Sequence, residues 1–187
     1  GNSLTVYLPE ATTDQWHAQV AFRTNLSSQA GKKYDFYCVV ESNNDLPGMT
    51  IKLTKTGDDN TFYFADKHVI TAYEDYVYVV DGMDGIDMEK ISLFFDFGGN
   101  PAGTEVTIKD IVFREHVESG NAGGGSGDTV IDPNSPDNMW LSMSVEEMFY
   151  YYAPGWNPID NPETEVNGNS LTVTLPEATT DQWQAQV

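Results

Sequence analysis

Residues 90–97 read KISLFFDF, and this stretch decides the fold of the chain. Its apolar residues at odd positions alternate with Ser92, Phe94 and Asp96, which is the period of a β-strand with one buried face. Residues 16–24 (WHAQVAFRT) and 49–55 (MTIKLTK) alternate in the same way. Each stretch therefore predicts a strand with one apolar face for a core and one face that carries Gln, Arg, Lys or Asp.

Further alternating or β-rich stretches occur at 3–8, 33–41, 60–65, 75–80 and 104–114. Short strands separated by turn residues predict an all-β chain, and we expect a β-sandwich of the jelly-roll type. The stretch from Ser144 to Glu147 resembles a helix capping box before the run MFYYY. One helical turn and a strand are both consistent with that segment.

The charge balance excludes several classes of partner. Among 187 residues, 9 are Lys or Arg and 29 are Asp or Glu, so the net charge is -20. Nucleic acid and anionic membrane surfaces would be repelled, and no apolar run approaches the length of a membrane span. The single cysteine, Cys38, rules out a disulfide within one chain and is expected to be buried. We therefore predict no nucleic-acid partner and no membrane insertion.

A repeat divides the chain. Residues 168–187 match residues 1–20 at 18 of 20 positions, with an offset of 167. This predicts tandem homologous modules, of which 1–118 is the body of one copy that lacks its own N-terminal segment. Residues 119–138 form a linker rich in Gly, Ser, Asp and Pro, and 139–187 are the N-terminal segment of the next copy.

Two arrangements of this segment are possible. Residues 139–167 either complete the body of the same chain or complete the body of another chain in a domain swap. In both cases the strand copies at 4–8 and 171–175 compete for one place in a sheet. We expect the surplus copy to pair with a neighbouring molecule.

The sequence gives little support for a catalytic function. The histidines His17, His68 and His116 accompany no nucleophile elbow and no HExxH motif, and His17 is replaced by Gln in the second copy. On strand alternation alone, His17 is expected on the polar face. Hydrolysis of a glycosidic bond needs two facing carboxylates, and Asp96 is the main candidate on that face. A small jelly-roll glycosidase is therefore kept as an alternative.

The polar faces suit a sugar better. Pyranose rings pack their C–H groups on aromatic faces, while their hydroxyls need amides, carboxylates and cations. Trp16 beside Gln19 has this character, and so does the cluster around Phe62 and Tyr63. Trp156, in a loop, either stacks on a sugar or closes the sandwich. An ordinary solvated face would look similar, so a structural or adhesion spacer without sugar binding is a second alternative.

Four segments in order resemble a known family: GNSLTV-LPEATTDQW-AQVAF, GKKYDFYCVVES, FFDFGGNPAG and VTIKDIVFREH. They are similar to carbohydrate-binding modules of families four and nine, and most of all to the tandem modules inserted in family 10 xylanases of gut Bacteroidetes. The resemblance implies a β-sandwich that binds xylan, a neutral β-linked polysaccharide, without catalysis and tethers a secreted or cell-surface xylanase to its substrate.

The resemblance also implies site residues. It assigns the sugar contacts to Trp16, Gln19, Arg23, Lys52, Phe62 or Tyr63, Asp96 and Asn100, with Trp183 and Gln186 as their equivalents in the second copy. Asp96 departs from the family, in which an amide occupies that position. The resemblance further implies a structural Ca²⁺ ion held by Asp110 with Glu146 or Glu147 opposite.

Overall fold

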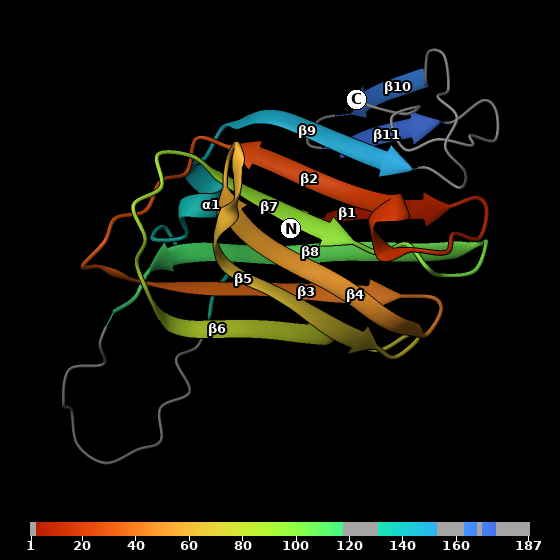
Figure 1. The fold of residues 1–187 in the computed structure, drawn as a ribbon, viewed down its shortest axis with the longest axis horizontal. Coiled ribbons are helices and arrows are strands. Elements are labelled where there is room, and N and C mark those ends of the chain that lie inside the picture. Colours follow the sequence, from red (N-terminus) through yellow and green to blue (C-terminus); the bar gives the residue numbers. More distant parts are fainter. Residues whose placement is uncertain (1–2, 118–130, 153–162, 168–169, 175–187) are drawn as a thin grey trace.

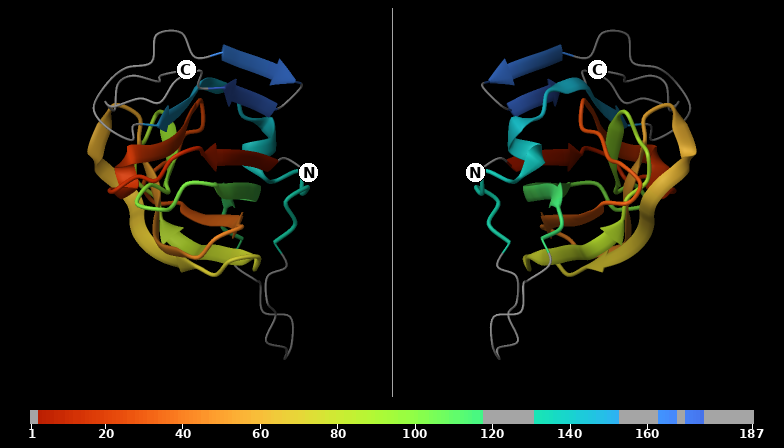
Figure 2. Two further views of the ribbon diagram at one scale, coloured as in Figure 1. Left: turned by 90° about the vertical axis from the view of Figure 1, so that its right-hand side faces the viewer. Right: turned by 90° about the vertical axis from the view of Figure 1, so that its left-hand side faces the viewer.

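A computed structural model describes residues 3–117, 131–152, 163–167 and 170–174 (Figure 1). Two antiparallel sheets pack face to face, as Figures 1 and 2 show. The five-stranded sheet has the order β5 (Asp58–Ile70), β4 (Leu46–Lys55), β7 (Ile91–Asp96), β2 (Ala18–Thr24) and β9 (Val145–Tyr152). The four-stranded sheet has the order β1 (Ser3–Leu8), β8 (Thr104–Glu115), β3 (Lys33–Ser42) and β6 (Tyr76–Asp84). The prediction of an all-β sandwich is confirmed.

Alternation along the strands builds the core. Across the five-stranded sheet, Val20 pairs with Phe95 and Phe95 with Ile51, and all three side chains are fully buried. The four-stranded sheet opposes them with residues such as Phe36 and Ile108. Cys38 belongs to the same core, as predicted. The hydrophobic effect therefore fixes which face of each strand is turned toward solvent.

The stretch 16–24 departs from a simple strand. Gln15–His17 form a short 3-10 turn, and β2 begins only at Ala18. Gly98 lies against this turn so closely that a Cβ on it would come within 2.2 Å of the Asp14 carbonyl oxygen. The placement of His17 on a polar face was wrong: the turn breaks the alternation, and the side chain is only 6% exposed.

The segment after the linker adds a helix and a strand. A short helix, α1 (Met139–Ser142), was not predicted, and its first turn is capped by Asn138, which accepts a hydrogen bond from the Trp140 N–H. Of the two forms consistent with the next segment, the structure has the strand, β9. Trp140 packs edge-on against Phe22 and so joins this segment to the core.

In the single chain, β9 pairs with β2, and β1 occupies the edge beside β8. The second copy of the β1 sequence, β11 (Ser170–Thr174), pairs instead with β10 (Glu163–Asn167). Exchange of these strands between chains stays a prediction. None of the helices in the described part of the chain is long and apolar enough to cross a membrane.

Candidate functional site

The outward residues of the five-stranded sheet form regular rungs across its strands. In one rung Gln19 of β2 pairs with Asp96 of β7, Asp96 with Thr50 of β4, and Thr50 with Lys67 of β5. We call the whole outward set the five-strand face: Gln19, Ala21, Arg23, Ser92, Phe94, Asp96, Thr50, Lys52, Thr54, Phe62 and Lys67. Because strands are spaced about 4.8 Å apart, a rung presents polar groups at regular intervals.

Gln19 and Asp96 are joined directly. The Gln19 amide nitrogen donates to Asp96 Oδ1 at 2.7 Å, so both side chains are held in one orientation. Burial raises the pKa of Asp96 to about 6, although the Gln19 hydrogen bond and the Lys52 charge act in the opposite direction. Near pH 7 the group is therefore a carboxylate with spare lone pairs, which can accept hydrogen bonds from hydroxyl groups.

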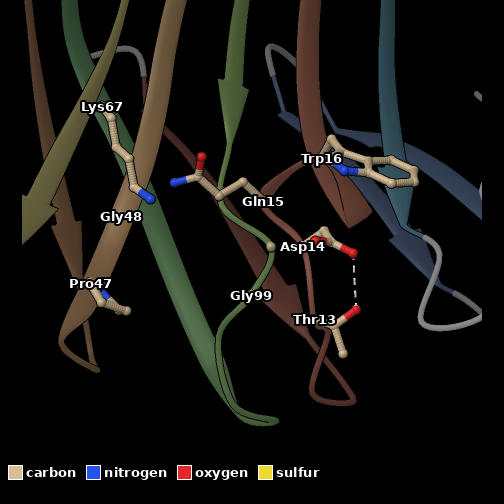
Figure 3. A pocket seen from close by; sticks show the side chains of 9 residues that line it. Thr13, Asp14, Gln15, Trp16, Pro47, Gly48, Lys67 and Gly99 are labelled. Carbon is tan, nitrogen blue, oxygen red and sulfur yellow. Dashed lines mark hydrogen bonds between the residues drawn. The ribbon is translucent and has the colours of Figure 1, made fainter.

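Trp16 lies at the end of this face, in the 3-10 turn before β2. Its side chain is 40% exposed, and its ring meets the His17 ring edge-on with centroids 4.3 Å apart. The indole borders a pocket of about 380 Å³, whose lining is shown in Figure 3. The pocket is lined by Thr13, Asp14, Gln15, Trp16, Pro47, Gly48, Lys67, Gly98 and Gly99. Because Trp16 precedes β2, the alternation of side chains along that strand does not determine which way the indole points.

The structure separates the two aromatic candidates on β5. The pairing of β4 with β5 shifts between Leu53 and Thr54, which leaves Tyr63 as the extra residue of a β-bulge. Phe62 lies opposite Thr54 on the five-strand face and is 45% exposed. Tyr63 instead turns inward, where its hydroxyl accepts a hydrogen bond from the Ile86 N–H at 3.0 Å.

The two remaining described candidates on the sheet are cations. Lys52 is partly buried beside Asp96 in β7 and lies 3.7 Å from Asp59, a loose surface ion pair. Arg23 is partly buried and lies opposite Ser92 in the register of β2 and β7. Both cations therefore belong to the five-strand face, as predicted from the sequence.

Asn100 does not join them. It is only 2% exposed, and its amide nitrogen donates to the carbonyl oxygens of Phe97 and Gly98. Asn100 was expected beside the sugar, but it closes the loop after β7 instead. Three other predicted contacts, Trp156, Trp183 and Gln186, lie outside the described residues.

The described side chains include two of the three expected calcium ligands, Asp110 and Glu146, and the calcium site stays a prediction. Asp110 occupies a left-handed position in β8, with φ 56°, while both carboxylate oxygens of Glu146 contact Lys90 Nζ at 2.8 and 2.6 Å. The side chain of Glu147 is not described. Calcium takes six to eight oxygen ligands, and these two carboxylates belong to no common cluster.

A different cluster lies at the far end of the four-stranded sheet. Asp35, Asp81 and His116 are the one group of three potential ligands found within the described ranges. Asp35 already accepts hydrogen bonds from the Arg114 guanidinium, at 3.1 Å, and from the Gly82 N–H, at 2.9 Å. Arg114 thus already supplies a cation to this carboxylate, and the arrangement is that of a structural ion pair.

Sequence reasoning missed Lys67 as a site residue. The predicted strand ended at residue 65, whereas β5 continues to Ile70 and places Lys67 opposite Thr50. The residues after 65 read DKHVI, which lack strict alternation, so only the sheet register could reveal the position. Gln15 could be suspected as a site residue from the sequence only because it is the neighbour of Trp16.

No family model matches the chain, and no curated protein matches it. Among solved structures, it is similar to one described as "CBM4 structure and function", with 21% identity, TM-score 0.48 and coverage of 61% of this chain and 71% of that one. It is also similar to "PbXyn10C CBM APO", with 14% identity, TM-score 0.43 and coverage of 60% and 66%. A third is the second N-terminal cellulose-binding domain of Cellulomonas fimi β-1,4-glucanase C, with 14% identity, TM-score 0.43 and coverage of 62% and 77%. At such TM-scores the backbones overlap only loosely, so conclusions about the site depend on the chain's own contacts.

Proposed function

We propose that the chain is a non-catalytic carbohydrate-binding module whose five-strand face takes a β-linked polysaccharide, xylan in the first place. The observation that carries this proposal is the rung of Gln19 and Asp96, held together at 2.7 Å and flanked by the exposed rings of Trp16 and Phe62. Rings would pack on the sugar's C–H faces, and the oriented amide and carboxylate would bind its hydroxyls.

The expected affinity is modest. Two stacking contacts contribute roughly 0.5–1.5 kcal/mol each beyond the area they bury, and hydrogen bonds exchanged with water add little more. With the hydrophobic burial of both rings added to these contributions, we expect a dissociation constant on the order of 10–100 μM for one module. Tandem copies on one chain would raise the overall affinity through effective concentration.

The arrangement supports binding rather than hydrolysis. Glycosidases place two carboxyl groups about 5–9.5 Å apart across the scissile bond. Among the outward residues of the three central strands β2, β7 and β4, Asp96 is the one carboxylate. The alternative of a glycosidase would need a second acid facing Asp96, and it predicts that the isolated chain releases reducing sugar from xylan. The second alternative, a structural or adhesion spacer, predicts no interaction between the chain and xylan.

Affinity electrophoresis in gels that contain soluble xylan tests the proposal. The chain should be retarded by xylan, and Trp16→Ala should migrate faster than the wild type in the same gel. Mobility in a gel without polysaccharide and the thermal melting temperature serve as controls. Unchanged mobility of the wild-type chain in xylan would favour the spacer.

We also infer that the parent protein carries tandem modules and that they tether a secreted or cell-surface xylanase to its substrate. Support for the tandem order comes from the 18 identical positions shared by 1–20 and 168–187. Because β11 repeats the SLTV sequence of β1, it could replace β1 beside β8 of another chain. Sedimentation over a range of concentrations would detect such an exchange as a dimer.

A further inference from the structure

Lys67 lies in the pocket beside the five-strand face, and no described acid pairs with it. Five cations, Lys32, Lys52, Lys90, Lys109 and Arg114, each lie within 4.0 Å of a carboxylate oxygen. Lys67 makes no such ion pair with any described residue, although acids outnumber cations 29 to 9 in the chain. Lys33 and Lys55 also lack an ion pair within the described residues, so the case for Lys67 depends on the second donor beside it.

A second donor meets Lys67 at the same point. The Thr50 hydroxyl donates to Gln15 Oε1 at 3.0 Å, which turns the Gln15 amide nitrogen toward β4. This nitrogen is buried and has no hydrogen-bond partner within the described part of the chain. Figure 3 shows the ammonium group and the amide facing each other beside Gly48.

Gly48 makes this approach possible. A Cβ at that position would stand 2.1 Å from Lys67 Cε, 2.9 Å from Lys67 Nζ and 2.6 Å from Gln15 Nε2. The two donor nitrogens are therefore close neighbours with no acceptor between them. Donors that converge without an acceptor bind an anion with two oxygens, such as a carboxylate, and a charged donor makes the stronger bond.

The acid in the same pocket faces elsewhere. Asp14 accepts a hydrogen bond from the Thr13 hydroxyl at 3.2 Å and lies 3.5 Å from His17 Nε2. Figure 3 shows its carboxylate turned toward Thr13 and away from Lys67. The two ends of the pocket thus differ in sign, and only the end at Lys67 suits an anion.

We propose that Lys67 and Gln15 form a carboxylate subsite for a uronic acid side group carried by the polysaccharide on the five-strand face. This inference rests on the proposed function, because the backbone of the glycan must lie on the same face. Trp16 borders the pocket from the other side, so a side group there adjoins a stacked sugar. The ligand is then a xylan whose uncharged backbone carries scattered uronic acid groups, as in glucuronoxylan, and not a polyanion of the kind that the net charge of -20 repels.

Isothermal titration with glucuronoxylan and with the same polymer after reduction of its carboxyl groups tests the subsite. The wild-type chain should bind the acidic polymer about tenfold more tightly than the reduced one. Lys67→Gln should remove this preference, so that the variant binds the acidic and the reduced polymer with equal affinity. Lys33→Gln is the matched control, since it makes the same charge change at an exposed position of the other sheet and should keep the preference.

Gly48→Ala supplies an independent variant, because its methyl group would displace Lys67 while the charge remains. It should also lose most of the preference. Free glucuronate at the same carboxyl concentration should not compete, since the subsite holds a group attached to a bound chain. Equal binding of both polymers by the wild type would overturn the carboxylate subsite, and so would full competition by glucuronate. The proposed function would stand in either case if both polymers bind. Binding of neither polymer would overturn both.

Discussion

Each sheet carries one carboxylate that faces away from the core and is largely buried. These are Asp35 in the four-stranded sheet and Asp96 in the five-stranded sheet. Burial alone would raise both pKa values. At Asp35, hydrogen bonds from the Gly82 N–H, His116 and Arg114 outweigh burial and hold the pKa below its ordinary value. At Asp96, one amide donor and the Lys52 charge do not outweigh it, and the pKa rises to about 6.

This difference in pKa distinguishes Asp35, a structural carboxylate, from Asp96, which is available to a ligand. Asp35 has donors on both oxygens and a guanidinium beside it, so a ligand could add nothing. Within the described part of the chain, Asp96 accepts a side-chain hydrogen bond from Gln19 alone, and it lies on a face with exposed aromatic rings. An under-satisfied carboxylate weakens the free fold and is ready to accept hydrogen bonds from a ligand.

The largest effect is expected from Asp35→Ala. The Arg114 side chain is only 8% exposed and would keep only a loose contact with Asp137, at 3.8 Å, so its buried charge would be poorly compensated, which costs about 3–5 kcal/mol of unfolding free energy. Urea unfolding at pH 7 measures this loss. Because the Asp35 pKa is depressed, the wild-type contribution is present above the unfolded pKa of about 3.9 and is lost as the pH falls through the lower folded value. A variant as stable as the wild type would contradict the structural role.

Asp96→Asn should act in the opposite direction. The pKa of Asp96 in the folded chain, about 6, lies above the model-peptide value of 3.8. Between these two pH values the folded state binds more protons than the unfolded state. The free energy of unfolding of the wild type therefore falls as the pH rises from 3.8 to 6. Above pH 6 the variant should therefore be more stable than the wild type by up to about 3 kcal/mol, and at pH 3.5 the two should agree. Thermal melts at both pH values provide the measurement, and equal melting temperatures at pH 7.5 would contradict the raised pKa.

The sequence predicts some of the elements that position Asp35, Asp96 and their neighbours, but not all of them. The strands carrying both acids follow from alternation, and Gln19, Arg23, Lys52 and Asp96 were assigned to one face before the structure was known. The 3-10 turn at Trp16 was not foreseen, because it depends on the close approach of Gly98, which is distant in the sequence. The inward turn of Tyr63 depends on a bulge in β5, and a bulge shifts the register without a mark in the residue pattern.

Trp16→Ala should reduce affinity for xylan about tenfold, roughly 1.4 kcal/mol, because a stacking face and its buried area are lost. Val79→Ala makes the matched change on the outward face of the four-stranded sheet, where Val79 is 47% exposed. It should leave the affinity unchanged. Titration of both variants with soluble xylan compares the two faces directly, and a similar loss for both would remove the assignment of binding to the five-strand face.

The smallest effect is expected from Lys109→Gln. Lys109 Nζ lies 3.1 Å from Glu41 and 2.7 Å from Asp75, so the outward face of the four-stranded sheet carries a cation that is already neutralised. Exposed ion pairs of this kind contribute about 0–1 kcal/mol, and salt weakens them further. The variant should lose at most that amount in urea unfolding and keep the preference for acidic xylan. Lys67→Gln should show the reverse: the preference is lost while the free energy of unfolding is unchanged, because no described acid pairs with Lys67 in the folded chain.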